Sequence, residues 1–263
     1  MHLRTVLGVI GCVMLAGCGV ESGPSEEEDL GSAEQAICSH DDDDFEVDFL
    51  GCTEFAGVGV IPIANARAAV PAEYSPVDLG NGQGLAVVRV ANCNNVVIDG
   101  KSVGGGTVAQ VGVSLIAPEG DGDINNFTVY YDTDSKKLAN ALKDAGVPAR
   151  YVPKLKYDYD AGDNTLEIRV PPPSKARYTV EGTVIPPSGT PVPFIANWWA
   201  TTSNTETKMN TVLPAIYFSG AQMTLTADHN SPLPALLGSD PYVFPILDSY
   251  NAFGDAHMVV DVR

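Results

Sequence analysis

Two lysines and one arginine are the basic side chains of this sequence whose spacing suggests chemistry. Lys154 and Lys156 alternate on one expected strand and so share a face, and a desolvated lysine amine is able to attack a carbonyl carbon. A solvated strand face is the simpler interpretation of this pair. Arg150 lies two residues after Pro148 of the turn sequence Gly146-Val147-Pro148, and a partly buried arginine at this point would pair with a carboxylate ligand. Arg150 is therefore the better site candidate, with a structural or surface arginine as the alternative.

The segment from Phe194 to Ala200 carries two adjacent tryptophans, Trp198 and Trp199. Because neighbouring side chains of a strand point to opposite faces, one tryptophan faces the core and the other faces away from it. Adjacent aromatic residues often line sugar or lipid sites, although core packing accounts for at least one of the two. We keep both as candidate ligand-binding residues.

The N-terminal segment has the layout of a bacterial lipoprotein signal. An apolar stretch from Val6 to Ala16, shorter than the ~20 residues that span a bilayer, ends in Leu15-Ala16-Gly17-Cys18. We expect residues 1–17 to be removed as a signal peptide and Cys18 to carry the lipid, so that a membrane is the first expected partner. Gly19, by similarity to the enterobacterial sorting rule, favours the outer membrane, with the domain facing the periplasm or the cell exterior. An ordinary secretory signal with an incidental Cys18 is the alternative.

Residues 18–48 are expected to form an acidic, disordered tether. They contain twelve Asp or Glu residues, no Lys or Arg and few large apolar residues, so they cannot bury enough surface to fold. The run Asp41-Asp42-Asp43-Asp44 is assigned to this tether, because it lacks the spaced ligands and the turn glycine of an EF-hand loop.

The remaining residues, 49–263, are expected to form one domain. They carry 14 basic and 21 acidic residues, a mildly acidic balance that argues against nucleic acid and anionic lipid headgroups as partners of the folded part. Their number is enough for a single large β domain with a sizeable core.

Three cysteines remain once Cys12 is cleaved and Cys18 is lipidated. Cys38, Cys52 and Cys93 permit one disulfide and one unpaired thiol in an oxidising compartment. A bond from Cys38 to Cys52 would join the tether to the domain, whereas a bond from Cys52 to Cys93 would join two early strands. The sequence leaves this choice open. No metal site is expected, because there is no Cys-x-x-Cys pair and the histidines are scattered.

Motifs of other chemistries are missing or are better explained by turns. The sequence has no Gly-x-Ser-x-Gly elbow, His-Glu-x-x-His helix, Walker loop or dinucleotide fingerprint, and we expect no cofactor. The segment from Asp121 to Asn126 offers oxygens suited to calcium, yet the same residue types are those that a β-turn requires, and we favour the turn.

The elements that must position these residues are mainly strands. Glycine and proline interrupt the domain at short intervals, and the runs between them are rich in Val, Ile, Thr and Tyr at period two. One helix is predicted, capped by Ser135, with Leu138, Ala141 and Leu142 at helical spacing and a stop at Gly146. We predict a mainly β fold, a large β-barrel or bent double sheet of about ten to twelve strands with one central helix, able to enclose a ligand cavity. The strands are expected near residues 57–63, 85–91, 95–98, 107–117, 126–132, 150–158, 164–170, 176–185, 193–201, 221–227 and 256–262.

Several segments follow one another in an order typical of a known family. They are the Val-Pro stretch from Arg67 to Leu79, the strand from Thr107 to Val113, the strand and helix from Phe127 to Ala145, the turn from Gly146 to Arg150, the segment from Leu233 to Leu237, and the last strand from His257 to Val260. In this order, from Val70 to Val260, the chain resembles the acetoacetate decarboxylase-like β-barrel family.

The resemblance implies a fold but also a loss of chemistry. In that family Gly-x-Pro is followed by two lysines, the first of which forms a Schiff base with the keto acid. Here the two positions are Ala149 and Arg150, and neither side chain is a nucleophile. A strand glutamate of the family falls at Gln110, which cannot serve as a general acid or base. The resemblance therefore implies a barrel without imine-based decarboxylation.

Three functions are consistent with this sequence. The first is a membrane-anchored, extracytoplasmic barrel that binds a small apolar or anionic organic ligand, with Arg150, Gln110 and one of Trp198 or Trp199 converging on a single interior cavity. The second is a divergent decarboxylase-like enzyme that acts on a keto acid or a related carbonyl compound through a rearranged site. The third is an interaction module of the cell envelope whose barrel is filled by side chains.

Overall fold

The computed structural model describes residues 44–263, which fold into thirteen strands and three helices. The expected lipidation site Cys18, the greater part of the expected tether and Cys38 lie outside the described residues. Among residues 44–263, none of the helices has the length and apolar character needed to cross a bilayer. The elements in chain order are β1 (Phe45–Pro62), α1 (Ile63–Ala69), β2 (Gln83–Ile98), β3 (Lys101–Ser114), β4 (Ile124–Thr133), α2 (Lys136–Asp144), β5 (Ala149–Tyr151), β6 (Lys156–Asp160), β7 (Thr165–Val170), β8 (Tyr178–Val184), β9 (Val192–Thr201), β10 (Glu206–Tyr217), β11 (Ala221–Ala227), α3 (Leu233–Leu237), β12 (Tyr242–Val243) and β13 (Leu247–Val262).

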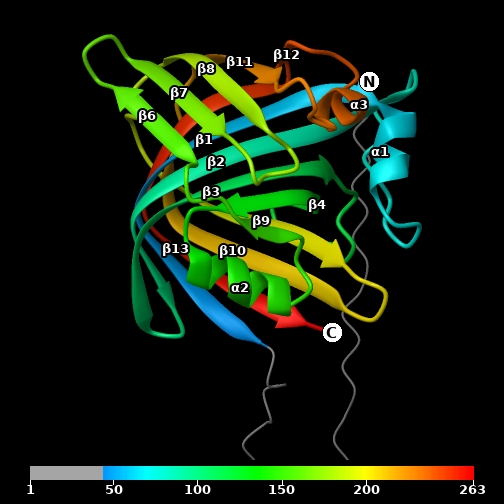
Figure 1. Ribbon diagram of the computed structural model, residues 1–263, viewed down its shortest axis with the longest axis horizontal. Coiled ribbons are helices and arrows are strands. Elements are labelled where there is room, and N and C mark those ends of the chain that lie inside the picture. Colours follow the sequence, from blue (N-terminus) through cyan, green and yellow to red (C-terminus); the bar gives the residue numbers. More distant parts are fainter. Residues whose placement is uncertain (1–43) are drawn as a thin grey trace, which may run out of the picture. The chain divides into compact units, whose positions relative to one another are not determined.

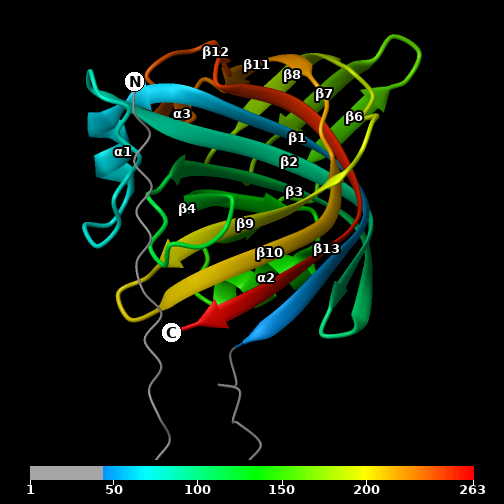
Figure 2. The same cartoon turned by 180° about the vertical axis from the view of Figure 1, so that it is seen from behind.

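Seven of the strands close into a barrel. They follow the order β3-β2-β1-β13-β10-β9-β4, and β4 pairs back with β3 to complete the ring (Figures 1 and 2). All neighbours in the ring are antiparallel except β4 and β9, which run parallel. Because each strand alternates its side chains, one set of residues points into the barrel and the other points outward.

A second sheet covers part of the barrel's outer face. Its five strands follow the order β12-β11-β8-β7-β6, and both views place it beside β1 and β2 (Figures 1 and 2). Phe55 and Val88 on the barrel belong to the same buried apolar cluster as Ile168 and Val180 on this sheet. The middle of β2 is therefore buried on both faces, which explains the nearly continuous apolar sequence from Leu85 to Ala91.

Helix α2 is the one helix that the sequence predicted. The Ser135 hydroxyl accepts a hydrogen bond from the Leu138 amide, and Gly146 follows the helix with a φ of +82°, a conformation that glycine adopts without strain. Leu138 and Leu142 are buried in the same apolar cluster as the barrel residues Val108 and Met258. The expected mainly β barrel with a central helix is thus confirmed.

The first strand begins earlier than the sequence predicted. β1 starts at Phe45, inside the segment assigned to the tether and before the expected domain boundary at residue 49. Val47 and Phe49 point into the buried apolar cluster, while Glu46 and Asp48, the residues that precede them, are acidic and point the other way. The segment was assigned to the tether because of its acidic composition, although its residues alternate between apolar and acidic as in a half-buried strand.

Other elements also differ from the prediction. β10 was not predicted, because several polar residues break its apolar pattern, and its pairing with β9 shifts register between Leu213 and Ile216. The strand expected at 150–158 is divided into β5 and β6 by a turn in which the Leu155 amide donates to the Val152 carbonyl. The short helices α1 and α3 were not predicted either.

One disulfide joins Cys52 on β1 to Cys93 on β2, which are register partners. Of the two pairings that the sequence left open, the structure has the one between early strands. The bond closes a loop with a sequence separation of 41 residues.

We predict that the double substitution Cys52→Ala and Cys93→Ala lowers the free energy of unfolding by about 2–4 kcal/mol, because the open chain gains conformational entropy in the unfolded state. Urea denaturation of the oxidised protein and of the variant measures the difference. The wild-type protein under reducing conditions should match the variant. An unchanged unfolding midpoint in both would show that the bond contributes nothing to stability.

Candidate functional site

The interior of the barrel contains a cavity of about 210 Å³ and a smaller adjoining space of about 20 Å³. The larger cavity is lined by residues from all seven strands of the ring, and the smaller one lies beside it around Gln110 and Tyr131. Arg89, Trp198, Thr211 and Leu213 line both. The larger cavity has a mainly apolar wall with a few polar groups, the usual character of a small-molecule site.

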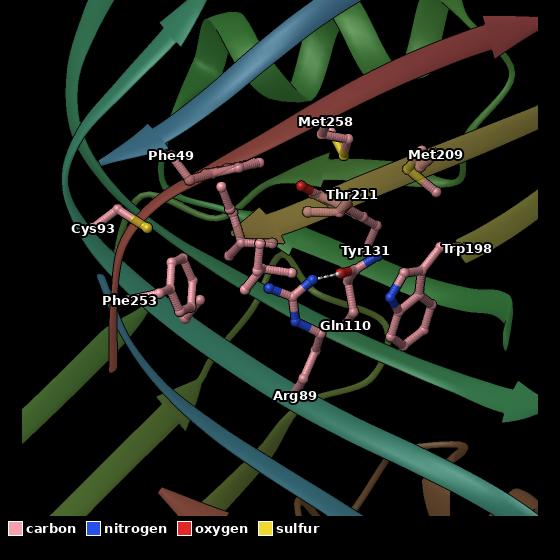
Figure 3. Close-up of a pocket in the computed structure, with 14 residues that line it drawn as sticks. Phe49, Arg89, Cys93, Gln110, Tyr131, Trp198, Met209, Thr211, Phe253 and Met258 are labelled. Carbon is pink, nitrogen blue, oxygen red and sulfur yellow. Dashed lines mark hydrogen bonds between the residues drawn. The ribbon is translucent and has the colours of Figure 1, made fainter. Parts of the chain in front are cut away.

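An ion pair with an attached amide spans the two spaces. The Arg89 side chain donates from Nε to Glu54 Oε2 at 2.8 Å, and one of its terminal nitrogens donates to Gln110 Oε1 at 3.0 Å. The other terminal nitrogen lies 2.5 Å from Glu54 Oε2. Figure 3 shows Arg89, Gln110 and Trp198 reaching into the same space from β2, β3 and β9. The side chains of Arg89 and Glu54 are only 17% and 9% exposed, so water screens this pair weakly.

Four residues that line the larger cavity each carry one buried polar atom with no hydrogen-bond partner among the described residues. These atoms are Asn126 Nδ2, Trp198 Nε1, Thr211 Oγ1 and Asn251 Oδ1. A buried polar atom without a partner costs about 1–3 kcal/mol, and most buried polar atoms in native proteins have one. Of the nine such atoms among the described residues, four belong to side chains around this one cavity, and rotation of these side chains would bring them to a molecule bound there.

The positions of the two tryptophans match the strand alternation. Trp198 points into the barrel and lines the cavity, whereas Trp199 points outward, packs against Tyr74, and donates its indole N–H to Asn125 Oδ1 at 3.2 Å. Lys208 lies over the Trp199 ring. Trp199 is therefore a packing residue on the outside of the barrel. Of the four candidates from the sequence, Gln110 and Trp198 meet at the interior site.

The expectation that Arg150 shares this cavity is wrong. Arg150 lies on β5, which extends the sheet beside β4 but is no part of the closed ring, and its guanidinium donates to the Pro173 carbonyl at 2.6 Å. Its register partner on β4 is Asp132, and the neighbouring Tyr131 is the residue that faces the interior. Because adjacent residues of a strand point to opposite faces, Arg150 points away from the barrel interior. Arg89 is the arginine that reaches the cavity.

The barrel interior has no lysine at the position where the resembled family has its first one. Ala149 packs against the apolar cluster inside the barrel, so the first position faces inward without an amine. Lys154 is exposed in a turn, and Lys156 on the outer sheet forms ion pairs with Asp158 and Glu167. None of the described residues that line the two interior spaces is a lysine.

The residues that the sequence reasoning missed are Glu54, Arg89, Asn126, Thr211 and Asn251. Arg89 gave a signal, because it is the single charged residue in the apolar run from Leu85 to Ala91. A single arginine in an apolar strand suggests that one face of the strand is in contact with water. Only the structure shows that both faces of this strand are buried.

Metal ligation has no support in residues 44–263, where no group of three His, Cys, Asp or Glu side chains is placed to hold an ion. The acidic turn considered for calcium is instead bonded to the protein. Asp121 pairs with Lys208 at 3.1 Å, and Asp123 accepts from the Ile195 amide at 2.7 Å.

Comparison with solved structures assigns the fold. An acetoacetate decarboxylase shares 13% identity over 82% of this chain and 88% of its own, with a TM-score of 0.56. The acetoacetate decarboxylase of Legionella pneumophila shares 10% identity over 82% of this chain and 86% of its own, with a TM-score of 0.55. The enduracididine biosynthesis enzyme MppR, solved with the condensation product of pyruvate and imidazole 4-carboxaldehyde, shares 11% identity over 84% and 88% of the two chains, with a TM-score of 0.50.

The chain therefore adopts the acetoacetate decarboxylase-like fold, as the order of its segments predicted. At these identities the likeness describes architecture alone. The sequence matches no protein-family model, and no curated protein is significantly similar to it.

Asp132, the register partner of Arg150, is a buried acid whose pKa is shifted toward neutrality. Burial raises the pKa of Asp132 to about 6, although a 2.6 Å hydrogen bond from Ser174 Oγ and the charge of Arg150 both favour the ionised form. A carboxyl whose pKa is higher in the folded state than in the unfolded chain destabilises the fold when it is ionised. Asp132 therefore does not destabilise the fold at low pH, where it is protonated. Its destabilising effect reaches its full size above about pH 6.

We predict that Asp132→Asn raises the free energy of unfolding at pH 7 by about 2 kcal/mol, because the amide keeps an acceptor for Ser174 and carries no charge. The gain should shrink as the pH falls through the window from about 6 to ~4 and vanish below it. Urea denaturation at several pH values measures this, with Asp144→Asn on the exposed end of α2 as the control. A variant less stable than wild type at pH 7 would contradict the assignment.

Proposed function

We propose that this protein binds a small amphipathic organic molecule inside its barrel, without Schiff-base catalysis. The single observation that carries the proposal is the 210 Å³ cavity with four buried, unpartnered polar atoms in an otherwise apolar wall. A volume of this size is below the ~300–1,000 Å³ of drug-sized sites, so the ligand is small.

The site's composition favours binding over the enzymatic alternative. The family chemistry needs a lysine amine of depressed pKa in the barrel. No described lysine lines the cavity, and the inward position after the Gly146-Val147-Pro148 turn is Ala149. The interaction-module alternative requires a filled barrel, which is at odds with the open volume around Trp198.

The rim of the cavity supports an amphipathic rather than a wholly polar ligand. Phe218 and Leu247 line the cavity and are 41% and 40% exposed, so they form an apolar edge between the interior and the solvent. Phe194, in contact with Phe218 through a ring-to-ring distance of 5.6 Å, continues this edge inward. An apolar tail would lie along this side while a polar head meets the unpartnered atoms.

The cellular setting of this function rests on the N-terminal sequence. We propose a lipoprotein of the bacterial cell envelope, anchored through a lipid on Cys18, with the outer membrane as its location. The support is the Leu15-Ala16-Gly17-Cys18 box after a short apolar segment.

We predict that Cys18→Ser releases the protein from membranes, because the thioether that holds the lipid can no longer form. Fractionation of the producing cells, with immunodetection in the membrane and soluble fractions, measures the shift. Cys38→Ser is the matched control and should stay with the membrane. Membrane association of the Cys18→Ser variant at the wild-type level would remove the proposed anchor.

We predict that Ala196→Phe abolishes binding of a small neutral probe, octan-2-one, because the added ring occupies the cavity that Ala196 lines. Isothermal titration calorimetry measures the affinity, and apolar burial should give a negative heat-capacity change. The control is Ile195→Phe, which places the same ring on the outward face of β9. Equal binding by both variants would show that the probe does not enter the barrel.

A further inference from the structure

We propose that the Glu54–Arg89 pair makes the cavity select a neutral ligand with a carbonyl-type acceptor and reject organic anions. This inference rests on the proposed function and specifies its ligand class. It also departs from the anionic ligand that an unpaired arginine in the cavity would favour.

The first observation is the charge of the cavity wall. Of the described residues that line the two interior spaces, Glu54 and Arg89 are the only charged ones, and they are bonded to each other. Each of the three guanidinium nitrogens has a partner, two at Glu54 Oε2 and one at Gln110 Oε1. The arginine charge is thus neutralised before any ligand enters.

The second observation is the kind of polar atom that remains free. Trp198 Nε1 can only donate, and Asn126 must present its Nδ2 donor because its Oδ1 already accepts from Ser114 Oγ at 3.1 Å. Asn126 and Trp198 are register partners on β4 and β9. Two donors from partner positions on neighbouring strands suit an oxygen that accepts two hydrogen bonds and carries no proton, such as the oxygen of a carbonyl group.

The other two atoms without a partner, Thr211 Oγ1 and Asn251 Oδ1, also belong to uncharged side chains. Thr211 Oγ1 is able to donate or accept, and Asn251 is paired in register with Glu54 across β1 and β13. No unpaired cation is left among the lining residues. A ligand carboxylate would have to remain uncompensated in a weakly solvated space or displace Glu54 from Arg89, which leaves a buried charge unpaired in either case.

The apolar rim determines how the ligand is oriented in the cavity. Phe194, Phe218 and Leu247 stand on the solvent side of the cavity, whereas Glu54, Arg89 and the free donors of Asn126 and Trp198 are buried. The ligand's carbonyl therefore lies inward and its hydrocarbon part lies toward the mouth. A medium-chain methyl ketone is a simple probe of this class.

The test compares octan-2-one with octanoate at pH 7, two probes of the same chain length that differ in charge. Wild-type protein should bind octan-2-one at least about 100-fold more tightly than octanoate, as measured by calorimetry. In Glu54→Gln the guanidinium loses its counter-ion, and the affinity for octanoate should rise about 100-fold. Glu46→Gln, at an exposed position on the same strand, should behave as wild type.

The double substitution Glu54→Gln and Arg89→Gln covers the case in which the single variant does not fold, since it removes both charges together. It should bind octan-2-one and still reject octanoate. Equal affinity of the wild-type protein for the two probes, or octanoate binding by the double variant, would overturn the charge selection while the cavity's function stands. Absence of binding for both probes in the wild-type protein would instead refute the proposed function and this inference with it.

Discussion

Closure of the seven-stranded ring by the pairing of β3 with β4 is the constraint on which the rest of the structure depends. Once the ring is closed, the inward side chains away from the mouth are shielded from water, and each polar one among them must find a partner inside the barrel. Glu54, Arg89 and Gln110 satisfy this requirement together, because they reach one another from three neighbouring strands, β1, β2 and β3. Asn126, Trp198, Thr211 and Asn251 do not satisfy it, and this contrast defines the candidate site.

The scaffold is shared with acetoacetate decarboxylases, but its interior is chemically different from what the family reaction needs. The inward position after the Gly-x-Pro turn is an alanine packed into the apolar cluster, and the neighbouring arginine faces away. The polar centre of the barrel is instead an ion pair of zero net charge. The fold alone therefore does not determine the chemistry of the barrel, because that chemistry resides in a few inward residues.

Much of the fold could be predicted from the sequence because its signals are local. Alternating Val, Ile and Thr predicted the strands, and Ser135 with Gly146 predicted both ends of α2. The site could be predicted only in part, because it depends on which face of each strand is enclosed. Alternation alone placed one tryptophan inside and one outside, but did not say which. Arg150 was misplaced because β5 lies beside the ring rather than in it, and Arg89 was missed because the second sheet that buries the other face of β2 comes from residues far along the chain.

The most direct test of the central claim, that the barrel interior is a ligand site, is native mass spectrometry of the protein purified from the cells that make it. The native mass should exceed the denatured mass by that of one small, neutral organic molecule, and the Ala196→Phe protein, purified in the same way, should lack this difference. Identical native and denatured masses for the wild-type protein, together with no uptake of octan-2-one, would contradict the account and favour a barrel whose cavity holds only water.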